Sequence, residues 1–157
     1  MKLKLVTVGK TDMDWVRTGM AVYRDRLVHY ANFTITELPD IKNASSLSRE
    51  QIKTKEGELI LKNLNPGDHV ILMDEKGREF TSTAWASWLE DRMSHLSGDL
   101  VFVIGGPYGF SDAVYARSNG MISLSRMTFS HQMVRVIFIE QLYRGFTIIR
   151  GEPYHHE

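Results

Sequence analysis

Short apolar runs alternate with longer stretches of helical periodicity along the whole chain. The apolar runs are rich in β-branched residues, and runs of this kind predict buried strands. Five strands are predicted in this way, over residues 3–8, 33–38, 70–73, 100–104 and 121–124. Helical patterns separate and follow them, over residues 12–30, 48–64, 81–96, 111–117 and 131–149. The alternation predicts an α/β domain whose mainly parallel sheet is flanked by helices.

Two loops stand where a ligand would bind in such a sheet, outside the carboxyl ends of the strands. The fourth strand runs into Gly105-Gly106-Pro107, and the fifth is followed by residues 125–130. The glycine turn can be a tight structural turn or a ligand loop. The second loop can hold the edges of a nucleobase or a polar cofactor, or it can only cap the last helix through Thr128 or Ser130.

Composition narrows the class of protein without naming a partner. The chain has 157 residues, which predicts a single domain over residues 1–157. Nineteen basic residues balance nineteen acidic ones, so the overall charge does not favour binding to nucleic acid. There is no cysteine, no cleavage signature and no apolar stretch long enough for a bilayer, which predicts a soluble cytoplasmic protein without a membrane partner. The six histidines are scattered, and no metal site is predicted.

The last helix carries a charged pair in apolar surroundings. Glu140 and Arg144 are four residues apart with the acid first, the favourable order for an ion pair on one helix face. A surface ion pair is one interpretation. However, apolar residues surround the pair on most sides of the helix, and such a helix is usually buried in a core or an interface. Charges in that setting suggest a function.

Four stretches in order carry a resemblance that spans the whole chain: KLKLVTVGK, VFVIGGPYGF, LSRMTFSHQMVRVIFIEQLYRGF and RGEPYHHE. Together they resemble the RlmH-type methyltransferases of the SPOUT class. The resemblance implies transfer of a methyl group from S-adenosylmethionine to N3 of a pseudouridine in 23S ribosomal RNA, on the assembled ribosome. It also implies a C-terminal trefoil knot and a homodimer, with large-subunit rRNA and the ribosome as partners and no role for DNA.

The resemblance also implies which residues form the site. Cofactor contacts fall on Met73, Gly105, Leu124, Ser125, Arg126, Met127, Thr128 and Phe129. The missing side chains of Gly105 and Gly106 would let backbone approach the cofactor. Glu140, His131, Tyr154 and His155 are alternatives for the general base, and Arg144 would hold a phosphate or orient the target base. The tail, residues 151–157, is expected to complete the active site of the partner chain.

Contacts to RNA are predicted for a few further residues. Tyr108, Phe110 and Tyr154 are candidates for stacking on bases, although plain packing explains each of them as well. Candidate phosphate contacts are Arg117, Arg126, Arg135 and Arg144. Two positions depart from the pattern of the family: Ser130 replaces a common Pro, and His156 replaces a common Arg or Lys.

Two other functions compete with methyl transfer. The first is a non-enzymatic ribosome-associated factor of the same fold, which would bind no cofactor. The second is a nucleotide- or flavin-binding module with a phosphate loop after the first strand. Gly9-Lys10-Thr11 gives the second little support, because Lys4 stands where a Walker A motif needs glycine.

Overall fold

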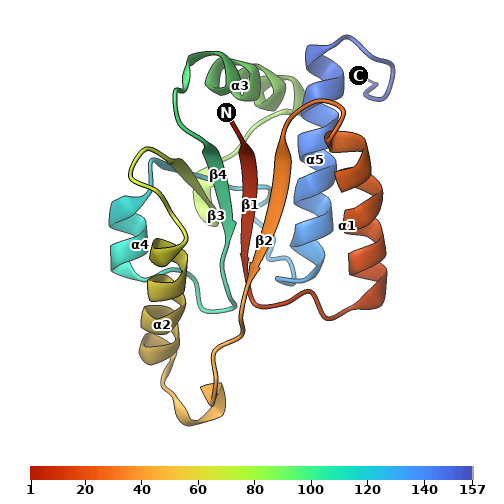
Figure 1. Ribbon diagram of the computed structural model, residues 1–157. Coiled ribbons are helices and arrows are strands. Elements are labelled where there is room, and N and C mark those ends of the chain that lie inside the picture. The colour runs from red at the N-terminus through yellow and green to blue at the C-terminus, as the bar shows by residue number, and fades with distance from the viewer. Residues whose placement is uncertain (157) are drawn as a thin grey trace.

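A five-stranded sheet forms the centre of the protein, whose computed structural model describes residues 1–156 (Figure 1). The strand order is β2-β1-β4-β3-β5, and every pair of neighbours is parallel, which confirms the predicted parallel sheet. β4 lies between β1 and β3 and is buried along its whole length, as its apolar sequence predicts. The strands are β1 (Leu3–Val8), β2 (Phe33–Leu38), β3 (His69–Arg78), β4 (Leu100–Ile104) and β5 (Gly120–Ile122).

Helices cover both faces of this sheet and produce two hydrophobic cores. α1, α3 and α5 pack on one face, and α2 and α4 pack on the other (Figure 1). The helices are α1 (Asp14–Leu27), α2 (Arg49–Lys62), α3 (Ser82–His95), α4 (Asp112–Arg117) and α5 (Met133–Ile149), with a short 3-10 turn at Ala44–Ser46. None of the helices in residues 1–156 combines the length and the apolar character needed to cross a membrane.

The third strand is longer than its apolar run predicts. β3 continues through five more residues, 74–78, which are mostly polar. The extension pairs with β5 after a shift in register that places Arg78 opposite Ile122. Backbone pairing, rather than side-chain burial, holds this part of the strand, so the hydrophobic pattern could not predict it.

A close crossing of two backbones lies at this extension. A Cβ atom on Gly77 would lie 2.6 Å from backbone atoms of Met121 and Ile122. The segment after the body of β3 therefore lies directly against the segment that leads into the last helix. A threaded C-terminal segment would need such a crossing, and the trefoil knot stays a prediction.

Replacing Gly77 by alanine is expected to destabilise the fold. The added methyl group would meet backbone atoms, which cannot rotate away, so we expect the free energy of unfolding to fall by about 1–3 kcal/mol. Urea denaturation measures the change. Gly67→Ala is the control, because no heavy atom lies within 4 Å of the Cβ position at Gly67. Equal stability of the two variants would mean that the crossing can relax.

Candidate active site

A cavity of about 910 Å³ opens at the carboxyl ends of β3, β4 and β5. Met73 pairs with both Ile104 and Ile122, so the apolar part of β3 ends at the same level as β4 and β5. The loops that follow these strands form most of the wall. All predicted cofactor contacts except Arg126 line the cavity: Met73, Gly105, Leu124, Ser125, Met127, Thr128 and Phe129.

Arg126 faces away from this cavity. Its exposed side chain forms an ion pair with Glu79, with 2.9 Å between Nε and Oε1. A charged guanidinium is more stable in water beside a carboxylate than against apolar side chains, so the side chain of Arg126 points away from the cavity. Its place as a cofactor contact is not supported by this arrangement, although its backbone belongs to the loop.

The glycine turn has a structural role, which is one of the two alternatives that its sequence allows, and it also lines the cavity. A Cβ atom on Gly105 would lie 2.8 Å from the ring of Phe110, and one on Gly106 would lie 2.4 Å from Oε2 of Glu56. Both Cβ positions thus point at the protein rather than at the cavity. The glycines are needed so that the turn can pack against a buried ring and a buried carboxyl group. Only Gly109 in this loop has a left-handed conformation, with φ at +83°.

Glu56, to which the sequence analysis gave no role, lies against Gly106 of the cavity wall. It lies on α2 and is only 7% exposed, and its Oε1 atom has no hydrogen-bond partner among residues 1–156. Burial raises the pKa of this carboxyl group from 4.5 to about 7. The burial of Glu56 could have been predicted from its spacing. It stands four residues from both Ile52 and Ile60, and residues four apart lie on the same face of a helix, which is buried here.

The loop before α5 is held by serine side chains. Ser125 Oγ accepts a hydrogen bond from the backbone N–H of Met127 at 3.0 Å. Ser130 Oγ accepts from the N–H groups of Gln132 and Met133 at 3.2 and 3.3 Å. Ser130 therefore caps the start of α5, and the departure from Pro at this position leaves the helix start intact.

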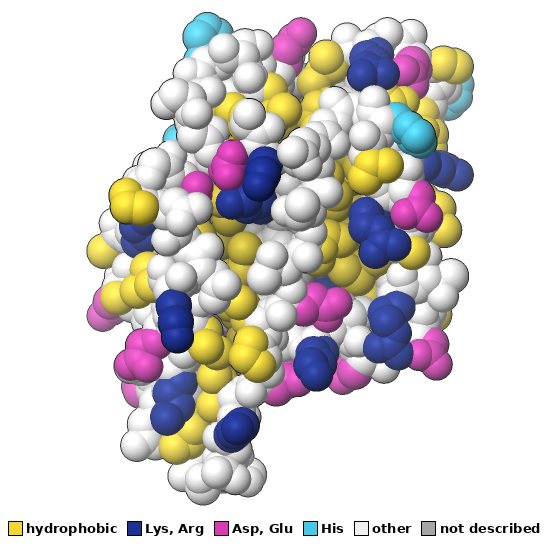
Figure 2. Space-filling view, viewed as in Figure 1, with side chains coloured by type: hydrophobic (Ala, Val, Ile, Leu, Met, Phe, Trp, Pro, Cys, Tyr) yellow, Lys and Arg dark blue, Asp and Glu magenta, His cyan; other side chains and the backbone are white. Residues whose placement is uncertain are grey.

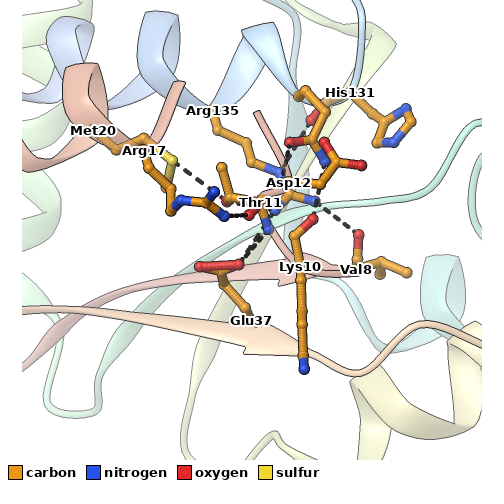
Figure 3. A network of polar contacts seen from close by, with 10 residues as sticks. Val8, Lys10, Thr11, Asp12, Arg17, Met20, Glu37, His131 and Arg135 are labelled. Atoms are coloured by element: carbon orange, nitrogen blue, oxygen red, sulfur yellow. Dashed lines mark hydrogen bonds and ion pairs between the residues drawn. The ribbon is translucent and has the colours of Figure 1, made fainter. Parts of the chain in front are cut away.

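Behind this loop, a buried arginine joins the start of α5 to the end of β1 (Figure 3). Arg135 is fully buried and donates to the carbonyl of Val8 and to Oγ1 of Thr11, both at 2.9 Å. It also donates to the carbonyl of His131 at 3.1 Å, and Glu37 lies 3.7 Å away. The prediction that Arg135 contacts an RNA phosphate is therefore wrong, because Arg135 is fully buried and the carbonyls of Val8 and His131 and the hydroxyl of Thr11 use its donors.

The same network fills the turn after β1. Gln132 donates to the carbonyl of Lys10 and accepts from the N–H of Asp12. The N–H groups of Asp12 and Thr11 donate to Gln132 and Glu37, so they are already used and do not serve a phosphate. The turn after β1 therefore does not support a nucleotide- or flavin-binding module.

Four of the five predicted catalytic residues form one cluster, which the C-terminal half of α5 and the tail build together. Arg144 donates to Glu140 at 2.6 Å, and the Tyr154 hydroxyl donates to the same oxygen at 2.8 Å. Arg144 also donates to Nδ1 of His155 at 3.1 Å, since a guanidinium can only donate. Burial, reinforced by hydrogen bonds with Tyr23 and Glu140, raises the pKa of Tyr154 above its ordinary value.

The tail is part of the folded structure up to residue 156. The Glu152 N–H donates to the carbonyl of Thr147 at 2.9 Å, and its carboxylate accepts from Tyr30. Tyr154 packs edge-on against Tyr143, with ring centres 4.7 Å apart. These contacts fix Tyr154 and His155 against α5; the last residue of the predicted tail lies outside the described part of the chain.

The fifth predicted catalytic residue, His131, lies apart from the other four. It lines the cavity, next to the start of α5, whereas the tail folds against the far end of this helix (Figure 1). Thirteen residues separate His131 from Arg144, which corresponds to roughly 20 Å of helix at 1.5 Å per residue. A single chain therefore does not bring the tail cluster to its own cavity.

The other predicted RNA contacts divide into exposed and engaged residues. Tyr108 is 41% exposed beside the cavity, with Arg49 above its ring at 5.1 Å. Phe110 is buried against Gly105, so its prediction as a stacking residue is wrong: it fills the core under the turn. Arg117 donates to the carbonyls of Asn65 and Asp68 at 2.8 and 3.1 Å.

Basic and acidic side chains are interspersed on the face of the protein that Figure 2 shows. Figure 2 shows Lys and Arg side chains scattered among acidic ones on the visible face, without a basic patch. This matches the balanced composition. Within residues 1–156, no cluster of three or more His, Asp or Glu side chains is arranged to hold a metal ion.

Comparison with known proteins identifies close relatives. A family model described as "Predicted SPOUT methyltransferase" matches residues 1–155. Proteins named "Ribosomal RNA large subunit methyltransferase H" match along their whole length. The relative from Parabacteroides distasonis is 55% identical over 157 residues, covering 100% of both chains. Those from Flavobacterium psychrophilum and Cytophaga hutchinsonii are 54% and 53% identical, covering 100% and 99% of this chain and 100% of each relative.

Proposed function

The chain belongs to the SPOUT methyltransferase family, and we propose that it methylates N3 of a pseudouridine in 23S ribosomal RNA with S-adenosylmethionine as the methyl donor. The relatives, identical at half or more of their positions over their full length, make it an enzyme that methylates large-subunit ribosomal RNA. The donor, the nucleotide and the atom are proposals. No observation favours the non-enzymatic alternative.

The cavity at the carboxyl ends of the strands is the observation that carries the proposal. Its volume of about 910 Å³ suits a cofactor of the size of S-adenosylmethionine. Its wall combines apolar side chains, such as Leu124 and Phe129, with the backbone of two loops. Those loops can offer N–H and C=O groups to an adenine and a methionine portion. The cofactor, when bound, supplies a methyl group activated by a positively charged sulfur.

We propose that the functional enzyme is a homodimer in which the tail of one chain serves the cavity of the other. The separation of His131 from the tail cluster along α5 supports this, because one chain alone leaves the cavity without Arg144 and His155. Exposed apolar side chains on α1 offer a surface for the second chain, among them Trp15 at 52% and Val22 at 44% exposure. Such side chains on one helix are typical of an interface.

Within the composite site, the contacts favour distinct roles. Glu140 accepts from Arg144 and Tyr154 on one oxygen and from Gln141 on the other, so it holds these side chains in place. Tyr154 stays protonated at neutral pH because its pKa is raised, and so it acts as a donor rather than as a base. Arg144 would orient the base or a phosphate.

A histidine is then the remaining candidate to accept the proton from N3 of the target base. His131 lines the cavity and can accept this proton, whereas His155, which arrives with the tail of the second chain, could accept it only after the hydrogen bond from Arg144 to its Nδ1 breaks. Removing the proton gives N3 the lone pair that attacks the methyl group. Holding the nucleophile, methyl group and sulfur in line is worth up to roughly 7–11 kcal/mol in well-oriented systems.

We propose the assembled ribosome, in the cytoplasm, as the substrate. The chain has nineteen basic and nineteen acidic residues and so no net charge at pH 7, and tight binding to free RNA is therefore not expected at physiological salt. A preformed particle supplies additional contacts and an ordered target base.

Transfer of labelled methyl groups tests this function. Assembled ribosomes lacking the modification, free large subunits and naked rRNA are incubated with the enzyme and labelled S-adenosylmethionine. We expect label in large-subunit RNA, most strongly with assembled ribosomes. Equal labelling of naked RNA would contradict the ribosome as the substrate, and no labelling by a protein that binds the cofactor would contradict the reaction.

A further inference from the structure

We propose that Glu56 binds the ammonium group of the methionine portion of S-adenosylmethionine, reaching the cofactor cavity past Gly106. The inference rests on the proposed function, because it needs this cofactor in the cavity. It adds to the site a residue from α2, an element to which the sequence analysis gave no role.

The carboxylate and the wall of the cavity are in direct contact. Gly106 lines the cavity, and its missing side chain leaves the space that the carboxylate of Glu56 occupies. A Cβ atom there would lie 2.4 Å from Oε2 and 2.8 Å from Oε1. No residue other than glycine could stand between this carboxylate and the cavity without moving one of them.

Glu56 lacks the partner that a buried carboxylate needs. At 7% exposure it is largely withdrawn from water, and its Oε1 atom accepts no hydrogen bond from residues 1–156. A buried carboxylate is costly unless a donor or a cation compensates it. The next residue, Gly57, lies against Ser111 and Val114 at the start of α4, and neither of these carries a charge.

Two cations of α2 that line the cavity are engaged elsewhere. Lys53 forms an ion pair with Glu50 at 2.8 Å, and Arg49 lies over the ring of Tyr108. A bound ligand can supply the cation that α2 itself does not offer to Glu56. The ammonium group of an amino acid has three N–H donors, whereas the sulfonium of the same cofactor has none, so the ammonium is the group that can satisfy the carboxylate.

Binding should also change the protonation of Glu56. Burial raises its pKa to about 7, so the free protein carries this proton to a greater extent at pH 6 than at pH 8. An adjacent ammonium favours the ionised form, and so cofactor binding should expel this proton. The release should be larger at pH 6 than at pH 8, because the free carboxyl group is mostly protonated only at the lower pH.

Isothermal titration with three ligands tests the assignment. We expect Glu56→Gln to weaken S-adenosylmethionine and S-adenosylhomocysteine about tenfold or more, since both carry the ammonium group. Methylthioadenosine lacks that group and should bind the variant and the wild type equally, which also shows that the cavity is intact. Glu58→Gln is the matched control, because it removes an exposed carboxylate two residues along the same helix and should change no affinity.

Proton release supplies a second readout that does not depend on turnover. Titrations in two buffers of different ionisation enthalpy give the number of protons released on binding. We expect the wild type to release more than Glu56→Gln, with a difference that falls from pH 6 to pH 8.

Each outcome decides the proposal. Equal affinities of wild type and Glu56→Gln for S-adenosylmethionine, or equal weakening of all three ligands, would overturn it. If Glu56→Gln lowered the affinity for S-adenosylmethionine alone, Glu56 would contact the sulfonium and not the ammonium group, and the proposal would be overturned. If the wild type bound S-adenosylmethionine and methylated ribosomes while Glu56→Gln behaved identically, this inference would fail and the proposed function would stand.

Discussion

Deletion of residues 153–157 is expected to abolish methyl transfer while leaving cofactor binding unchanged. The deletion removes Tyr154 and His155 from the cluster with Glu140 and Arg144, and none of the removed residues that the structure describes lines the cavity. Labelled methyl transfer to ribosomes measures the first effect, and titration with S-adenosylmethionine measures the second. Turnover by the shortened chain would contradict a role for the tail in catalysis.

Mixed dimers show in which chain the tail acts. One chain lacks residues 153–157, and the other carries Thr128→Trp, which fills its cavity from a loop. If the tail serves the partner, the intact cavity of the first chain meets the intact tail of the second, and activity returns in the mixture. If the tail serves its own chain, the mixture stays inactive.

Replacing Arg135 by methionine is expected to lower the free energy of unfolding by about 3–5 kcal/mol. Methionine fills similar space but leaves the carbonyls of Val8 and His131 and the hydroxyl of Thr11 without their buried donor. Urea denaturation measures the loss. Arg24→Met, which removes a surface ion pair with Asp25, should change stability by less than about 1 kcal/mol. A similarly small change for Arg135→Met would mean that other groups satisfy these atoms.

Much of the fold follows from the sequence, because the signals are local. β1 and β4 begin and end where their apolar runs do, since burial on both faces of a parallel sheet requires such runs, and the bounds of the edge strand β2 were also predicted correctly. The start of α2 also has a local signal, because Ser48 and Gln51 stand three residues apart and form a capping box in the structure. The order of the strands and the polar extension of β3 depend on contacts between distant segments, and no local pattern contains them.

The site was predictable where its residues follow strands, and not where charged residues are buried. The loops after β4 and β5 could be located because ligands bind at the carboxyl ends of parallel strands. Glu56 and Arg135 were missed or misplaced because an ionisable side chain is usually exposed. Arg135 is buried because backbone carbonyls take up its donors, and which carbonyls lie within reach is known only once β1 and α5 are packed together.

The strand order affects how the protein folds during translation. β1 is synthesised first, yet on one side it pairs with β4, with Leu3 opposite Leu100. During translation the first strand can pair only with β2, and its other edge remains open until residues 100–104 have left the ribosome. Over that interval the nascent chain exposes an apolar strand edge, a surface on which newly made proteins aggregate or bind chaperones.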